Sequence, residues 1–126
     1  MPTNKVDVRE GDGFFAGSNF VIEFQALAQD GTPENINGWT LSYTWRRRAD
    51  QAVADLTKTI AGGGITITNP SQGQGIISFV PADTDNVTIK PGVYIHRLTR
   101  TDTGSVSSII PGRGYKSSTV VLLPKV

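Results

Sequence analysis

Apolar and polar residues alternate along two stretches of the chain, residues 20–28 and 39–45. A period of two places successive side chains on opposite faces of an extended strand, so each stretch predicts a β-strand with one buried face. The apolar series of the first stretch is Phe20, Ile22, Phe24 and Ala26. That of the second is Trp39, Leu41, Tyr43 and Trp45, alternating with Thr40, Ser42 and Thr44. The second pattern is the stronger, and we expect this strand at the centre of one sheet.

Further segments with strand composition follow at short intervals. They span residues 54–60, 64–68, 75–80, 93–100, 105–110 and 118–123. The sequences between them, GGG, NPSQGQG, KPG, DTG and PGRG, are typical of turns, because Gly accepts a positive φ and Pro fixes a negative one. One short helix is expected at residues 81–87, where Asp83 can cap exposed amides. Short strands with turn signals this dense predict an all-β sandwich or barrel.

The length of 126 residues fits one domain with a single modest core. Residues 1–17 are polar and contain glycine, with isolated apolar residues at Val6, Val8, Phe14 and Phe15. We therefore expect an extended N-terminal arm, residues 1–17, followed by a sandwich domain over residues 18–126. Such an arm can add an edge strand to the sheet of a partner, or it can be a frayed terminus, and the sequence favours neither.

The charges of the chain nearly balance, with 12 Lys+Arg against 11 Asp+Glu and a formal net charge of +1. This charge gives no long-range field for capturing nucleic acid or an anionic membrane, and we expect neither as a partner. The absence of Cys excludes disulfides and thiolate metal sites. The N-terminal sequence lacks the apolar block of a secretion signal, and no apolar run approaches the roughly 20 residues of a membrane-spanning helix. We expect synthesis and folding in the cytoplasm.

The residues that resemble catalytic or metal-binding features have simpler structural explanations. His96 is the only histidine, lies in phase with apolar neighbours on a predicted strand, and is expected to be packed and hydrogen-bonded. Asp83 and Asp85 lack the further oxygen ligands of a calcium loop. The Gly-rich segments are followed by strands or turns instead of helix N-termini, and no serine has the surroundings of a nucleophile elbow. We expect no catalytic residues, no cofactor and no metal site.

The order of motifs between residues 18 and 123 carries a resemblance to a known family. It runs GSNFVIEFQALAQDGTPENINGWTLSYTW, then GGGITITNPSQGQGIISFV, and then PADTDNVTIKPGVYIHRL. This order is similar to that of the small immunoglobulin-like β-sandwich domain of bacteriophage tail proteins, notably the N-terminal domain of upper baseplate proteins. The resemblance implies a single immunoglobulin-like antiparallel β-sandwich of about seven to nine strands, in which the Tyr94 hydroxyl reaches back to the backbone upstream.

The resemblance also implies a structural subunit of a virion that acts through protein–protein contacts, with other virion structural proteins and copies of itself as partners. Those baseplate proteins continue into a long fibre-like region, whereas this chain stops at Val126, so we expect a compact tail or baseplate adaptor. A capsid decoration protein on the phage head is the alternative within this class. A carbohydrate-binding module that binds a cell-surface glycan weakly is an alternative from another class. It needs exposed aromatic rings, and those outside predicted core positions are Tyr115, Phe14 and Phe15.

Three consecutive arginines follow the strand predicted at residues 39–45. They can form a solvated strand end, with Asp50 and Asp55 as nearby carboxylates, or part of a protein interface, where guanidinium groups are enriched. The last strand, STVVLL, adds a second feature of this kind, because it carries apolar residues on both faces although only one face meets the core. Its outer face is expected to be covered by the N-terminal arm or by a neighbouring subunit. The candidate interface residues are Arg46, Arg47, Arg48, Arg97, Arg100, Phe14, Phe15, Val121 and Leu123.

Overall fold

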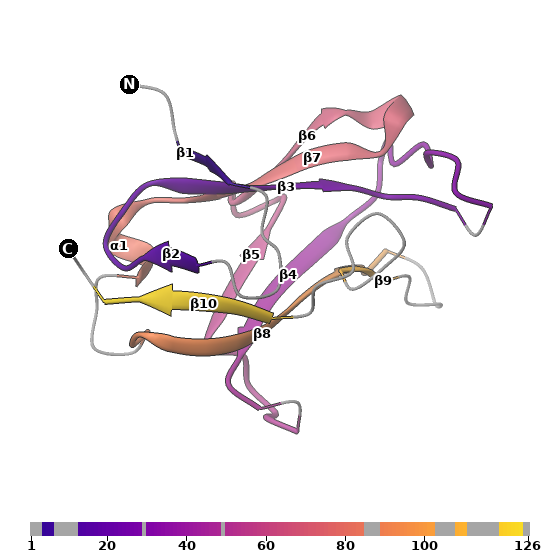
Figure 1. The fold of residues 1–126 in the computed structure, drawn as a ribbon. Coiled ribbons are helices and arrows are strands. Elements are labelled where there is room, and N and C mark those ends of the chain that lie inside the picture. Colours follow the sequence, from indigo (N-terminus) through magenta and orange to yellow (C-terminus); the bar gives the residue numbers. More distant parts are fainter. Residues whose placement is uncertain are drawn as a thin grey trace.

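Two β-sheets lie face to face, with a layer of apolar side chains between them, in the computed structural model of this protein (Figure 1). The structure describes residues 4–6, 13–28, 30–48, 50–84, 89–102, 108–110 and 119–124. Strands make up most of the secondary structure within these ranges. The fold is therefore an all-β sandwich, as the alternating pattern predicted.

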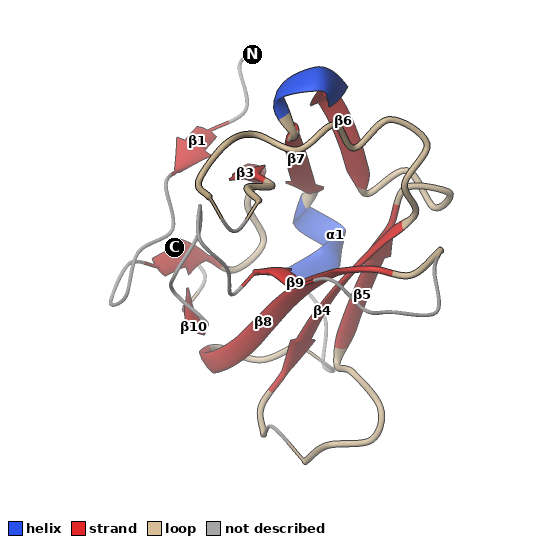
Figure 2. Ribbon diagram, turned by 90° about the vertical axis from the view of Figure 1, so that its right-hand side faces the viewer, coloured by secondary structure: helices blue, strands red, loops and turns tan. Residues whose placement is uncertain are grey.

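The described strands divide between the sheets as follows. The first sheet contains, in spatial order, β1 (Asn4–Val6), β3 (Phe20–Gln25), β7 (Gln74–Phe79) and β6 (Ile65–Asn69). The second contains, in spatial order, β2 (Gly13–Phe15), β10 (Thr119–Leu123), β8 (Gly92–Arg100), β4 (Leu41–Arg46) and β5 (Leu56–Thr59), and β9 (Ser108–Ile110) also pairs with β8. Figure 2 shows β8, β4 and β5 side by side.

Helical structure in the described residues is limited to two short turns, η1 (Pro70–Gln72) before β7 and α1 (Pro81–Thr84) before β8. Within the same ranges, no helix has the length and apolar character needed to cross a membrane. The helix expected at residues 81–87 is thus present as one turn ending at Thr84, and residues 85–88, including Asp85, lie outside the described part of the chain.

The N-terminal segment contributes a strand to each sheet. β1 pairs in parallel with β3, and β2 pairs in parallel with β10. The sequence left open whether this segment would pair with a partner's sheet or fray, and both of its described strands pair within their own chain. These two parallel pairings are exceptions to the expected antiparallel arrangement, and the two strands bring the described total to ten, against the about seven to nine expected.

The core contains the alternate residues that the sequence assigned to it. In β3, β4 and β10 the buried residues include Phe20, Ile22, Phe24, Leu41, Tyr43, Trp45, Val120 and Leu122. Five aromatic rings contact one another in series, in the order Phe14, Phe20, Phe79, Trp45 and Tyr94, with centroid separations of 4.1, 4.4, 5.2 and 5.0 Å. The second and third of these rings come from the first sheet and the others from the second sheet, so the series holds the two layers together.

Trp39 departs from the predicted core pattern. The chain turns at Gly38, which has a φ of 82°, and the amide of Trp39 donates a hydrogen bond to the carbonyl oxygen of Ile36 at 3.1 Å. Strand β4 begins only at Leu41. The indole of Trp39 is therefore partly buried at the margin of the core, and the guanidinium of Arg100 lies over it, 4.1 Å from the ring centroid.

A chain of hydrogen bonds runs through the core beneath the second sheet. The indole Nε1 of Trp45 donates to the hydroxyl oxygen of Tyr43 at 2.7 Å, and this hydroxyl lies 2.9 Å from Nδ1 of His96. All three residues are fully buried. Buried polar groups cost free energy unless they are hydrogen-bonded, so these contacts explain how the core accommodates a histidine. The prediction of a packed, hydrogen-bonded His96 is confirmed.

A largely buried ion pair joins β5 of the second sheet to α1, the turn that follows β7 of the first sheet. The Nζ atom of Lys58 lies 2.6 Å from Oδ2 of Asp83, and it also lies over the ring of Phe79. The same carboxylate oxygen accepts a hydrogen bond of 2.8 Å from the amide of Val80, the residue before the turn. The predicted capping role of Asp83 is confirmed.

The side chain of Tyr94 holds the backbone segment that leads into β8. Its hydroxyl donates a hydrogen bond of 2.5 Å to the carbonyl oxygen of Lys90. This is the contact with the upstream backbone that the resemblance implied. Burial raises the pKa of Tyr94 above its ordinary value of 10.0, and the nearby negative charge of Asp55 raises this pKa further.

Candidate functional site

The outer face of the second sheet brings together five of the nine candidate interface residues. Strand residues that alternate with core residues point away from the core. In β2, β10 and β8 these outward residues include a set that we call the apolar patch: Phe15, Val121, Leu123, Val93 and Ile95. Further along β8 and on the neighbouring strand β4, the outward residues include Arg97 and Arg46, which we call the arginine pair.

The strand register makes the apolar patch continuous. Leu123 is the register partner of Phe15, and Val121 is the register partner of Val93. Register partners lie side by side on the same face of a sheet. Phe15 is 50% exposed and Val93 is 59% exposed, whereas the two β10 residues are half-buried. Adjacent apolar side chains with this much exposure are typical of a surface that binds another protein.

The arginine pair lies at the end of this patch. Arg97 is the register partner of Thr44, and Arg46 is the register partner of Ile95, which makes the two arginines diagonal neighbours, about 7–8 Å apart. Arg46 donates from Nη1 to Oγ1 of Thr44 at 2.9 Å and from Nε to the carbonyl oxygen of Gln51 at 3.0 Å. Its guanidinium is therefore held in place by Thr44 and by the loop between β4 and β5.

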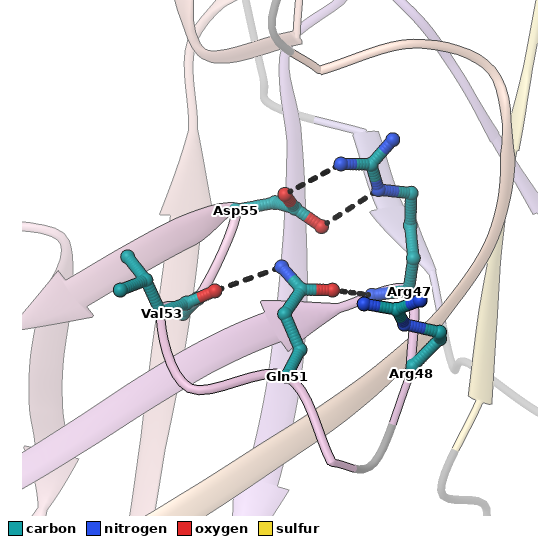
Figure 3. Close-up of a pocket in the computed structure, with 6 residues that line it drawn as sticks. Arg47, Arg48, Gln51, Val53 and Asp55 are labelled. Atoms are coloured by element: carbon teal, nitrogen blue, oxygen red, sulfur yellow. Dashed lines mark hydrogen bonds and ion pairs between the residues drawn. The ribbon is translucent and has the colours of Figure 1, made fainter.

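The other two consecutive arginines belong to the loop between β4 and β5. Figure 3 shows this loop around an open hollow of about 660 Å³, with the Arg47 and Asp55 side chains meeting end to end. Arg47 donates to both carboxylate oxygens of Asp55, at 3.2 and 3.3 Å, and Arg48 lies 3.6 Å from Asp50. The carboxylates proposed from the sequence are thus the observed partners. For these two arginines the structure supports the solvated strand end.

Gln51 fixes the shape of the same loop. Its Oε1 accepts a hydrogen bond of 3.2 Å from the backbone amide of Arg47, and its Nε2 donates to the carbonyl oxygen of Val53 at 2.8 Å (Figure 3). Because these bonds are made within the loop, the hollow in the described structure is lined by groups that already have partners. We assign it a structural role.

Arg100 lies at the opposite end of β8 and is also paired. It donates from Nε and Nη2 to the two carboxylate oxygens of Asp102, at 2.6 and 3.1 Å. The hydrogen bond from Arg100 lowers the pKa of the Asp102 carboxyl below its ordinary value of 3.8. With its guanidinium stacked on Trp39, Arg100 does not extend the surface formed by the arginine pair.

Phe14 is not a surface residue, which corrects its assignment as a candidate interface residue. It is 3% exposed, and its ring stacks on Phe20 with a centroid separation of 4.1 Å. β2 turns its two phenylalanines to opposite sides, so that Phe14 enters the core while Phe15 faces outward. The N-terminal segment thereby supplies both a core residue and a surface residue.

Val93 and Ile95 complete the apolar patch, and sequence reasoning missed both. The sequence did contain a signal for an apolar outer face on this strand. Val93 and Ile95 alternate with Tyr94 and His96, so apolar residues stand at consecutive positions and point to both faces. The same feature had pointed to Val121 and Leu123 on the last strand. The aromatic residues Tyr43, Trp45 and Tyr94 are buried, and Tyr115 lies outside the described residues.

In the part of the chain that the structure describes, no three His, Asp or Glu side chains gather as a metal site requires. Comparison with known proteins adds no assignment, since neither a protein-family model nor a curated protein sequence matches this chain.

Proposed function

We propose that this chain is an immunoglobulin-like structural subunit of a bacteriophage virion, a tail or baseplate adaptor that works through protein–protein contacts at the outer face of its second sheet. The observation that carries the proposal is the apolar patch, where Phe15 and Val93 are half or more exposed on neighbouring parts of one sheet. The virion as the setting is the part that the sequence resemblance supplies.

The immunoglobulin-like assignment is supported by strand order. The first sheet follows the order β1, β3, β7, β6, and the second follows β2, β10, β8, β4, β5. In immunoglobulin-like sandwiches one sheet has the strand order A, B, E, D and the other contains C, F and G, an arrangement that β1, β3, β7, β6 and β4, β8, β10 follow. A tyrosine near the start of strand F there bonds to the backbone a few residues upstream. The hydrogen bond from Tyr94 to Lys90 takes this form.

A carbohydrate-binding role has less support. Stacking against sugar rings requires exposed aromatic side chains, and among the described aromatic residues Phe15 is the one that is half exposed. Phe15 lies beside Leu123 and near Val121, so it forms part of a mainly apolar surface, whereas ligand sites pair such surfaces with placed polar groups that fix the orientation of the ligand. A protein partner fits this surface better.

The location of the chain in particles tests the proposal. Particles of the phage that encodes the chain are separated into tails and heads, and each fraction is assayed by quantitative mass spectrometry. We expect a fixed copy number in the tail fraction. Its presence in the head fraction would support a decoration protein, and its absence from both fractions would overturn a virion role.

A pair of matched variants tests the contact surface. Val93 and Val53 are both exposed valines, at 59% and 76%, but Val53 lies in the loop between β4 and β5. We expect Val93→Asp to reduce incorporation into particles and Val53→Asp to leave it unchanged, with both purified chains retaining the wild-type Tm. Equal incorporation of the two variants would argue against the outer face as the contact.

A further inference from the structure

We infer that the outer face binds a protein surface that presents carboxylates to the arginine pair beside an apolar centre, and that a second copy of this chain is not the occupant. The inference rests on the proposed function, because it assumes that this face makes a protein–protein contact. It adds the chemistry of the partner.

The described strands of the second sheet carry no carboxylate. None of its described strands contains an Asp or a Glu: β2, β4, β5, β8, β9 and β10 read GFF, LSYTWR, LTKT, GVYIHRLTR, SII and TVVLL. The face therefore combines apolar and hydroxyl-bearing side chains with the positive charges of Arg46 and Arg97.

Three acidic residues in the described loops next to this sheet already have arginine partners. Asp55 forms two hydrogen bonds with Arg47, and Asp102 forms two with Arg100. Asp50 lies 3.6 Å from Arg48. Within the described residues, these contacts leave the arginine pair without a carboxylate partner.

The positions of the two arginines on neighbouring strands favour a shared anionic partner. Arg46 is held by its bonds to Thr44 and Gln51, and Arg97, the register partner of Thr44, lies diagonally across from it on β8. Like charges on neighbouring strands repel each other, and a carboxylate placed between them removes that repulsion. Arg97 is exposed, so a partner can reach it without displacing an internal bond.

Charge complementarity distinguishes among the possible binding partners of the outer face. A second copy of the chain packed face to face would bring further arginines and no carboxylate from the described strands of its own sheet, leaving charges unpaired in a desolvated contact. Nucleic acid would supply anions, but the apolar patch is next to the arginine pair and the net charge is only +1. An acidic and apolar protein surface satisfies both parts of the face.

The test uses the full chain labelled with 15N, and two short amphipathic peptides that share a leucine face and differ in having glutamate or lysine at the flanking positions. We expect the glutamate peptide to shift the amide resonances of β2, β8 and β10, and the lysine peptide to bind at least several-fold more weakly. Arg97→Ser should weaken glutamate-peptide binding about tenfold. Arg48→Ser, which removes an exposed charge from the loop, should leave the affinity unchanged.

Each remaining outcome counts against the inference. Concentration-dependent shifts of the same resonances without peptide, together with a dimer in sedimentation, would identify a second copy as the occupant. Equal affinity for the two peptides, or equal weakening by the two arginine variants, would remove the role of the arginine pair. Tighter binding of a DNA duplex than of the glutamate peptide would favour nucleic acid. This assay needs no particles, so its failure is separable from absence of the chain from the virion.

Discussion

The ammonium group of Lys58 and the carboxylate of Asp83 meet 2.6 Å apart where the edge of the second sheet approaches the end of β7. Both side chains are largely buried, with 15% and 22% of their surface exposed. Removing one charge from such a pair leaves the other poorly compensated. This contact is therefore a sensitive point for the stability of the sandwich.

Asp83→Asn should lower the free energy of unfolding by about 1–3 kcal/mol, because it leaves the Lys58 charge over Phe79 without its anion. The asparagine oxygen can still accept the hydrogen bond from Val80, which separates the loss of charge from the loss of the cap. Urea denaturation measures the effect. In the double variant with Lys58→Met, most of the loss should be recovered, and strict additivity of the two changes would contradict the role of the pair.

Tyr43→Phe should destabilise the protein by more than about 2 kcal/mol, because one hydroxyl contacts both Trp45 and His96 in a fully buried site. The replacement conserves the ring and its packing, so the loss reports on the hydrogen bonds. Thermal and urea unfolding measure it. A loss below about 0.5 kcal/mol would mean that water or another group replaces the hydroxyl.

The stability of the protein should fall at alkaline pH in part through Tyr94. Its pKa is raised in the folded state by burial and by Asp55, so the unfolded chain releases this proton first. The contribution of Tyr94 is fully present below about pH 10 and is lost as the pH rises through the raised pKa. Urea denaturation between about pH 9 and 11 should show a smaller loss for Tyr94→Phe than for the wild type. If the free energy of unfolding fell equally with pH in the two proteins, this role of Tyr94 would be contradicted.

Arg47 and Arg48 are adjacent in sequence and should differ in their effect on stability. Asp55, the partner of Arg47, is only 8% exposed, whereas Arg48 and Asp50 are 76% and 87% exposed. Arg47→Ser should therefore cost about 1 kcal/mol, and Arg48→Ser should stay within about 0.5 kcal/mol of the wild type. Thermal unfolding at matched ionic strength distinguishes them, and equal losses would mean that the loop is held by its other bonds.

The strands with long alternating patterns were predictable because burial of one face dictates their sequence. Residues 20–28 and 39–45 correspond to β3 and β4 with small shifts at their ends. Trp39 was misassigned because the turn at Gly38 is set by backbone geometry that alternation does not record. Phe14 was misassigned because β2 has three residues, too few to show a period.

The candidate site was predictable in part for a related reason. Apolar residues on both faces of β10 pointed to an outer apolar surface, and Val121 and Leu123 do lie on the outer face. Alternation within β4 and β8 places Arg46 and Arg97 on this face, but their proximity depends on the cross-strand register, which brings Arg97 opposite Thr44 and diagonal to Arg46. Register is a property of paired strands, and a single strand sequence does not contain it.

The position of β10 has a consequence for the order of assembly during biosynthesis. β10 lies between β2 and β8, so the strand nearest the C-terminus completes a pairing with one of the first strands made. Contacts between segments so distant along the chain form late, because a long loop must close first. While β10 is still within the ribosomal exit tunnel, the part of β8 that pairs with β10 has no strand on that side. The nascent chain is thus open to edge-to-edge aggregation until β10 has emerged and paired.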